Sequence, residues 1–223
     1  MLNRKRVEGG IKALFFLCGL TAVGAVLFIS VYLVFAGVPA IQELGLARFV
    51  LGDTWNPQQE QYGILPFLLT SRAGTGGAVL LGVPIGVLTA LFLAKTARPG
   101  WAKAIRAAVA LLAGIPSVVY GLVGMVVLVP AVQRAFSLPS GANLLSAVLV
   151  LSVMILPSIV RVAETALRAV PREYEEASLA LGATPAETMF RVSLPAARSG
   201  VATAAALGVG GAVSLARAGV LGS

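Results

Sequence analysis

The chain has 223 residues, of which 58% are hydrophobic and 12% charged, and its formal net charge is +8. A soluble domain of this length could not cover so much apolar side chain with polar surface, so the composition excludes an ordinary soluble protein. The chain contains no histidine and one cysteine, Cys18, which weighs against hydrolytic catalysis, a metal site and a disulfide framework. We therefore expect an integral membrane protein that is not an enzyme and holds no catalytic residue, metal or cofactor.

Long stretches without a charged side chain predict the membrane spans. They cover residues 13–42, 73–94, 107–133, 135–160 and 199–216. An α-helix needs roughly 20 apolar residues to cross the hydrocarbon core, so four runs are long enough and the fifth lies at the lower limit. Continuous apolar runs argue against a β-barrel. The predicted fold class is all-α, a polytopic membrane helical bundle of about five spans over residues 13–223.

The basic residues predict the orientation of these spans. Thirteen of them lie before the first span, between the second and third, or after the fourth, whereas only three lie in the alternate segments. The positive-inside rule then places the amino terminus, residues 1–12, in the cytoplasm and the chain in the cell (inner) membrane. The first run is too long for a signal peptide, so we expect it to be retained. Scattered basic residues also argue against nucleic acid as a partner and leave membrane lipid as the surroundings.

The segment 39–71 then faces outside. Residues typical of turns between short helical pieces occur in it, namely Gly52, Asp53, Asn56, Pro57 and Gly63. Trp55 and Tyr62 are expected at headgroup depth, where aromatic side chains gather.

Small and polar residues in two of the runs suggest close packing or a pathway. Gly82 and Gly86 form a small-xxx-small face in the second run. In the third run, Pro116, Ser117 and Tyr120 are candidates for the lining of a translocation path. Ordinary helix packing explains such residues equally well.

The segment 170–195 predicts two short helices joined by a tight turn. Pro171 suits a first helical turn, and Glu173, Glu175 and Glu176 suit the positive end of a helix. Gly182 can close that helix in the left-handed conformation. A second helix should follow, with Thr184 as its cap, Pro185 at its first position and Glu187 completing a capping box, and Pro195 should halt it.

The spacing within this hairpin carries a resemblance. Glu176-Ala177-Ser178, then Gly182, then Val192-x-Leu194-Pro195 resemble the EAA signature of ABC importer permeases. The resemblance implies an ABC type I importer permease-like fold, in which the hairpin docks on a cytoplasmic ATPase. The contact residues it implies are Glu176, Ala177, Ser178, Leu181, Gly182, Ala183, Phe190, Leu194 and Pro195. Ser178 replaces the second alanine of the signature, and a small residue still permits close packing. Without the resemblance, the hairpin would be a connector between two spans.

Three further stretches are similar to the C-type permease of the phosphate-specific importer. They are Leu51–Ser71, with a W-x-P element and YG-x-LP, Ile115–Leu122 and Met154–Val160. The resemblance implies translocation of inorganic phosphate, with a second permease subunit, a dimeric ATP-binding subunit and an external phosphate-binding protein as partners. The chain lacks a GxxxxGK[ST] phosphate loop, so ATP hydrolysis belongs to a partner. The alternatives are a permease for molybdate, sulfate or another small solute, and a non-conducting membrane scaffold.

The resemblance breaks near the carboxyl terminus. The fifth span of that family carries an arginine and, four residues on, a glutamate, where this chain has Gly211 and Leu215. The chain also stops before the family's sixth span, so we expect a truncated or altered tail and little phosphate transport. Arg217 is expected to be an interfacial charge. Arg161 and Glu164, three residues apart, could pair on one helix face, with ordinary positive-inside anchoring as the other account.

Overall fold

The computed structural model describes the backbone of residues 2–220 and the side chains of residues 8–214 other than 10 and 40. The chain forms two compact units, residues 1–66 and 67–223. The first contains helices α1 (Leu2–Leu44) and α2 (Leu46–Leu51), strand β1 (Trp55–Asn56), the 3-10 turn η1 (Pro57–Gln59) and strand β2 (Gln61–Tyr62). Almost every described side chain of α1 is exposed, as expected of an apolar helix whose surroundings are lipid or other helices.

Residues 52–63 fold back on themselves in the first unit. The two short strands pair antiparallel, with Trp55 opposite Tyr62, and the two rings meet edge to face with centroids 5.6 Å apart. Gly52 and Gly63 pass so close that a Cβ on Gly63 would overlap the backbone of Gly52. Turns and short helical pieces were predicted here and are present, but the strand pairing was not foreseen.

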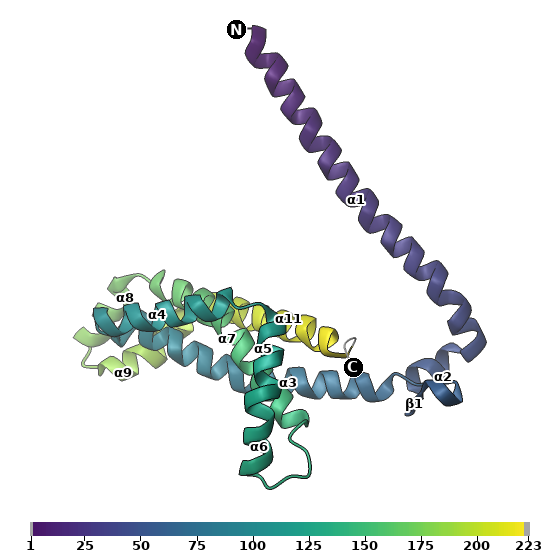
Figure 1. The fold of residues 1–223 in the computed structure, drawn as a ribbon. Helices are drawn as coiled ribbons and strands as arrows, with labels where there is room; N and C mark the ends of the chain where they lie inside the picture. The colour runs from purple at the N-terminus through teal and green to yellow at the C-terminus, as the bar shows by residue number, and fades with distance from the viewer. Residues whose placement is uncertain (1, 221–223) are drawn as a thin grey trace. The chain divides into compact units, whose positions relative to one another are not determined.

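The second unit is helical throughout the part of the chain that the structure describes, apart from short connections. Its elements are α3 (Leu65–Leu91), the π-helical η2 (Phe92–Thr96), α4 (Pro99–Gly114), α5 (Ser117–Val123), the π-helical η3 (Gly124–Leu128), α6 (Val129–Ala135), α7 (Leu144–Arg168), α8 (Arg172–Ala180), α9 (Pro185–Thr188), the π-helical η4 (Met189–Ser193), α10 (Leu194–Ala196) and α11 (Arg198–Val220). Helix α7 lies between α4 and α11 and contacts both, and α8 and α9 lie at one end of the bundle (Figure 1).

Four helical stretches of the described residues are long and apolar enough to cross a membrane. They are Ile11–Leu44, Leu65–Thr96, Ser117–Ala135 and Leu144–Arg168. A fifth span is possible if Pro185–Ala196 and Arg198–Ser214, which meet at a bend of 74°, count as one. The predicted all-α polytopic helical bundle is therefore confirmed, with four spans among the described residues, or five if the bent pair is one span.

Two of the predicted spans were placed wrongly. The run 107–133 is not one helix, because α4 ends at Gly114 and α5 begins at Ser117. Pro116 lacks a backbone N–H and disfavours helical geometry at Ile115, so the helix breaks there. The fourth span begins at Leu144 rather than near residue 135. Asn143 caps it, its side-chain oxygen accepting from the N–H of Ser146 at 3.0 Å.

The core of the second unit lies along α7. Ile155 and Ile159 are buried there, and both contact helices on two sides. A Cβ on Gly86 of α3 would lie 2.7 Å from Cγ2 of Ile159, and a Cβ on Gly208 of α11 would lie 2.7 Å from its Cδ1. A Cβ on Gly82 would similarly lie 2.8 Å from Cδ1 of Ile155. Helix α7 thus packs against the predicted small-residue face of Gly82 and Gly86.

Candidate functional site

The hairpin of residues 170–195 forms as its turn chemistry predicts. Helix α8 ends at Ala180, and Gly182 has a φ of 88°, the left-handed conformation. The N–H of Gly182 donates to the carbonyl of Leu179 at 3.0 Å, and that of Ala183 donates to the carbonyl of Ser178 at 3.2 Å. These bonds satisfy carbonyls that a helix end would otherwise leave without partners.

A capping box starts the second helix of the hairpin. Thr184 Oγ1 accepts from the N–H of Glu187 at 3.3 Å, and Glu187 Oε2 accepts from the N–H of Thr184 at 2.9 Å. The backbone hydrogen bond from Thr184, followed by that from its hydroxyl, holds the pKa of the Glu187 carboxyl below its ordinary value. The charged form of Glu187 therefore favours the folded turn.

Pro195 lies at the end of the second helix, as the sequence predicts. The helical path runs from α9 through the π-helical η4 into α10, which ends at Ala196, one residue after Pro195. Proline lacks a backbone N–H and disfavours a regular helix. The chain bends by 74° between Ala196 and Arg198.

The two helices of the hairpin are tied to each other by a hydroxyl pair. Ser178 Oγ of α8 lies 2.9 Å from Oγ1 of Thr188 of α9, and Thr188 is buried. Ser178 occupies the place of the second alanine in the EAA signature. The sequence predicts only that a small residue here permits close packing. The hydroxyl of Ser178 also adds a hydrogen bond between the two helices.

The turn of the hairpin presents apolar side chains at its surface. Leu181 is 90% exposed and Phe190 is 51% exposed. A hollow of about 290 Å³ lies beside the turn, lined by Ser178, Leu181, Gly182, Ala183, Glu187 and Arg191. Four of the nine implied contact residues thus line one hollow.

The other implied contact residues are placed differently. Glu176, Ala177 and Pro195 are exposed, as Phe190 is. Leu194 packs against the hydrophobic core of the bundle, so it anchors the hairpin to the core and does not face outward.

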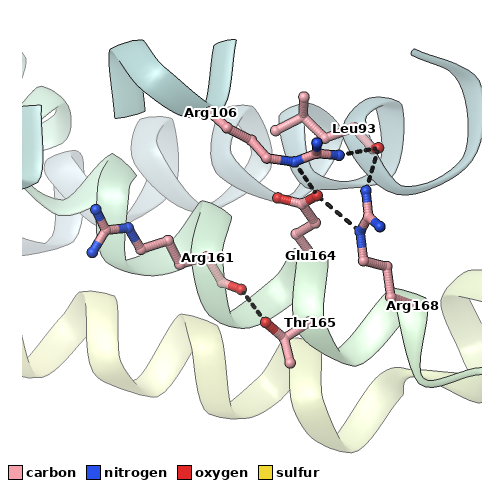
Figure 2. A network of polar contacts seen from close by, with 6 residues as sticks. All are labelled: Leu93, Arg106, Arg161, Glu164, Thr165 and Arg168. Atoms are coloured by element: carbon pink, nitrogen blue, oxygen red, sulfur yellow. Dashed lines mark hydrogen bonds and ion pairs between the residues drawn. The ribbon is translucent and has the colours of Figure 1, made fainter. Parts of the chain in front are cut away.

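A second polar cluster joins α4, η2 and α7 (Figure 2). Glu164 Oε1 of α7 accepts from Nε of Arg106 in α4 at 2.8 Å and from Nε of Arg168 in α7 at 2.9 Å. Both guanidinium groups also donate to the carbonyl of Leu93 in η2, which directly follows α3, at 3.4 Å. Of the two accounts that the sequence left open for Arg161, pairing with Glu164 is excluded, because Glu164 pairs with Arg106 and Arg168 and the Arg161 guanidinium points away from it.

The candidate path residues gather at the break between α4 and α5. Pro116 precedes α5, Ser117 begins it, and both are exposed. The hydroxyl of Tyr120 donates to the carbonyl of Leu112 at 2.8 Å and so ties α5 back to α4. This contact gives Tyr120 a structural role at the bend.

In α11, Gly211 lies against α7. A Cβ at Gly211 would lie 3.7 Å from Cγ2 of Ile155, which is an ordinary van der Waals contact. The side chains of Leu215 and Arg217 lie outside the described residues.

Comparison with known proteins identifies the family. Residues 82–219 match the family of binding-protein-dependent transport system inner membrane components. The chain is 38% identical over 197 residues to the probable ABC transporter permease protein YqgH of Bacillus subtilis, covering 86% of this chain and 63% of the relative. It is 33% identical over 216 residues to the phosphate transport system permease protein PstC 2 of Mycobacterium tuberculosis, covering 87% of this chain and 66% of the relative.

A solved structure supports the same assignment. An inward-facing conformation of the MetNI methionine ABC transporter matches with a TM-score of 0.59 and 25% identity over 72% of this chain and 74% of that one. The chain belongs to the family of binding-protein-dependent transport system inner membrane components, and its fold is that of ABC type I importer permeases. Its resemblance to permeases of the PstC type is confirmed. The chain spans about two thirds of the length of these curated relatives, 63% and 66% for the two named above.

Proposed function

We propose that this chain is one of two permease subunits of an ABC importer for inorganic phosphate. The observation that carries the proposal is the hairpin of residues 170–195, whose turn is fixed by Gly182 and the capping box while Leu181 stands 90% exposed. A rigid turn that presents a large apolar side chain beside a hollow suits docking into a groove of another protein. The relatives named for phosphate transport supply the substrate class.

The hairpin binds the partner that hydrolyses ATP. Glu176, Ala177, Ser178 and Gly182 form the centre of the contact, with Leu181 and Phe190 covered on docking. The amino terminus and the hairpin lie in the cytoplasm, and an external phosphate-binding protein delivers the anion at the opposite face. A second permease subunit completes the pathway, and Pro116 and Ser117 line part of it.

Replacing Leu181 tests the docking step. Leu181→Ser removes an exposed apolar anchor, so it should leave the fold intact and weaken binding of the ATPase by roughly tenfold or more. Leu181→Met, which keeps the apolar volume, should bind as the unmodified chain does. The measurement is co-purification of the ATP-binding subunit at increasing dilution. Equal retention of the ATPase by Leu181→Ser would contradict the assignment of the hairpin.

Uptake of labelled anions tests the substrate. The chain is co-expressed with its second permease, ATPase and binding protein, and uptake of phosphate is measured against excess sulfate or molybdate. Since Gly211 and Leu215 replace the family's charged pair, uptake of phosphate by the unmodified chain should be weak. Uptake should rise in Gly211→Arg/Leu215→Glu, because the guanidinium group of arginine can donate two hydrogen bonds to an anion that has lost its hydration. Uptake that sulfate or molybdate abolishes would replace phosphate with that solute.

A further inference from the structure

The end of α3 meets the hairpin in a polar contact that the sequence did not reveal. Lys95 of η2 forms an ion pair with Glu175 of α8, and the hydroxyl of Ser193 in η4 donates to the same carboxylate oxygen at 2.9 Å. Beside this pair, the hydroxyl of Thr96 donates to Sδ of Met189 at 3.3 Å. These five residues, called the joint below, connect the second predicted span to both halves of the hairpin.

The joint is better shielded than a surface ion pair. The side chains of Lys95 and Glu175 are 12% and 22% exposed, and Ser193 is fully buried. Shielded charges are screened less by salt and depend more on each other, because a partner left alone there has lost much of its hydration. The geometry of this contact is therefore more strongly maintained than that of an exposed pair.

The covalent connections of the hairpin are bent, whereas the joint is a direct contact. On one side, residues 169–171 separate α7 from α8 without continuing either helix. On the other side, the chain bends by 74° between Ala196 and Arg198. The joint is formed by α8 and two π-helical segments, η2 and η4. Turns of π-helix are frequent at functional sites. A displacement of the hairpin thus reaches α3 through the joint more directly than it reaches α7 or α11 along the chain.

We propose that Lys95 and Glu175 are positioning residues that couple movement of the hairpin to α3. The pair holds α8 at a fixed place on the end of the span, so that a partner bound to the hairpin moves α3 with it. This inference rests on the proposed function, in which the hairpin docks on an ATPase, and it adds the span that receives the movement and the residues that deliver it.

Neutralising Glu175 tests the proposal in the assembled transporter. Glu175→Gln should keep the ATPase bound and hydrolysing, while substrate uptake per ATP falls by roughly 2- to 30-fold, the range expected for a residue that modulates coupling between sites. The ratio does not depend on how much protein inserts. Glu173→Gln, an exposed carboxylate in the first turn of the same helix, is the matched control and should leave the ratio unchanged.

Exchanging the two charges separates coupling from a general structural effect. Lys95→Glu/Glu175→Lys restores an ion pair, and Ser193 can accept from an ammonium group as well as donate to a carboxylate. The exchanged pair should recover most of the uptake per ATP that Glu175→Gln loses when both variants are measured side by side. An unchanged ratio in Glu175→Gln, or failure of the exchange to restore it, would overturn the proposal.

A cross-link tests the joint without any partner. Thr96→Cys and Met189→Cys, placed in a Cys18→Ser background, should be joined by a short bifunctional thiol reagent even when the ATPase is absent. Cross-linking together with failure of the unmodified chain to bind an ATPase would reject the proposed function and leave the joint in place. Absence of cross-linking would reject the joint itself.

Discussion

At the scale of single residues, Gly182 is required for its backbone conformation rather than for space. Its φ is 88°, and a Cβ built on it would meet nothing within 4 Å. The left-handed conformation costs about 1–2 kcal/mol for a residue with a side chain, and β-branched residues tolerate it least.

Gly182→Val should therefore open the turn and reduce binding of the ATPase without preventing membrane insertion. Gly182→Asn should bind better than the valine variant, since asparagine adopts this conformation more readily. Gly100→Val is the matched control, because a Cβ there also meets nothing within 4 Å but no left-handed conformation is involved. Co-purification of the ATPase is the measurement, and equal binding by the two valine variants would refute the role of the turn.

Glu164 joins α4, α7 and η2 through two arginines, and its side chain is 12% exposed. Glu164→Gln removes the charge that both guanidinium groups share. The arginine side chains are 41% and 51% exposed, so solvent screens part of the loss, and we expect destabilisation of about 1–2 kcal/mol.

Thermal unfolding in detergent measures this loss. The unfolding temperature should fall for Glu164→Gln and remain constant for Arg161→Gln, because Arg161 points away from the carboxylate. Equal falls in the two variants would show that the loss does not come from the contacts of the Glu164 carboxylate.

At the scale of elements, α7 depends on glycines in the helices beside it. At Gly86 an added Cβ would lie 2.7 Å from Cγ2 and 3.0 Å from Cβ of Ile159, atoms close to the backbone that cannot move away freely. Overpacking of this kind costs typically about 1–3 kcal/mol.

Gly86→Ala should therefore lower the unfolding temperature even though alanine favours helix more than glycine does. Gly76→Ala on the same helix has open space and should be neutral or slightly stabilising. The two substitutions should not be additive: the double variant Gly86→Ala/Ile159→Ala should lose less stability than the sum of the losses in the two single variants. Additive losses would show that the two residues do not pack together.

At the scale of the whole molecule, the basic residues predict the side of the membrane on which each connection lies. Single cysteines at Gln58 and Ser140, in a Cys18→Ser background, should react with an impermeant thiol reagent added outside intact cells. A cysteine at Ala180, which is exposed at the hairpin, should react only after the cells are opened. Outside labelling at Ala180 would reverse the orientation and place the hairpin away from any cytoplasmic ATPase.

The sequence alone determined the features that depend on neighbouring residues. Apolar runs predicted the helical bundle, because lipid demands internally bonded backbone. Gly182, Thr184 and Glu187 predicted the turn and the cap of the hairpin, because these hydrogen bonds join residues a few positions apart.

Only the tertiary structure decided which charges meet. Glu164 accepts from Arg106, 58 residues away, and Glu175 pairs with Lys95, which lies on another helix. The phase and packing of separate helices set these partnerships, and neither leaves a periodic signal along the chain.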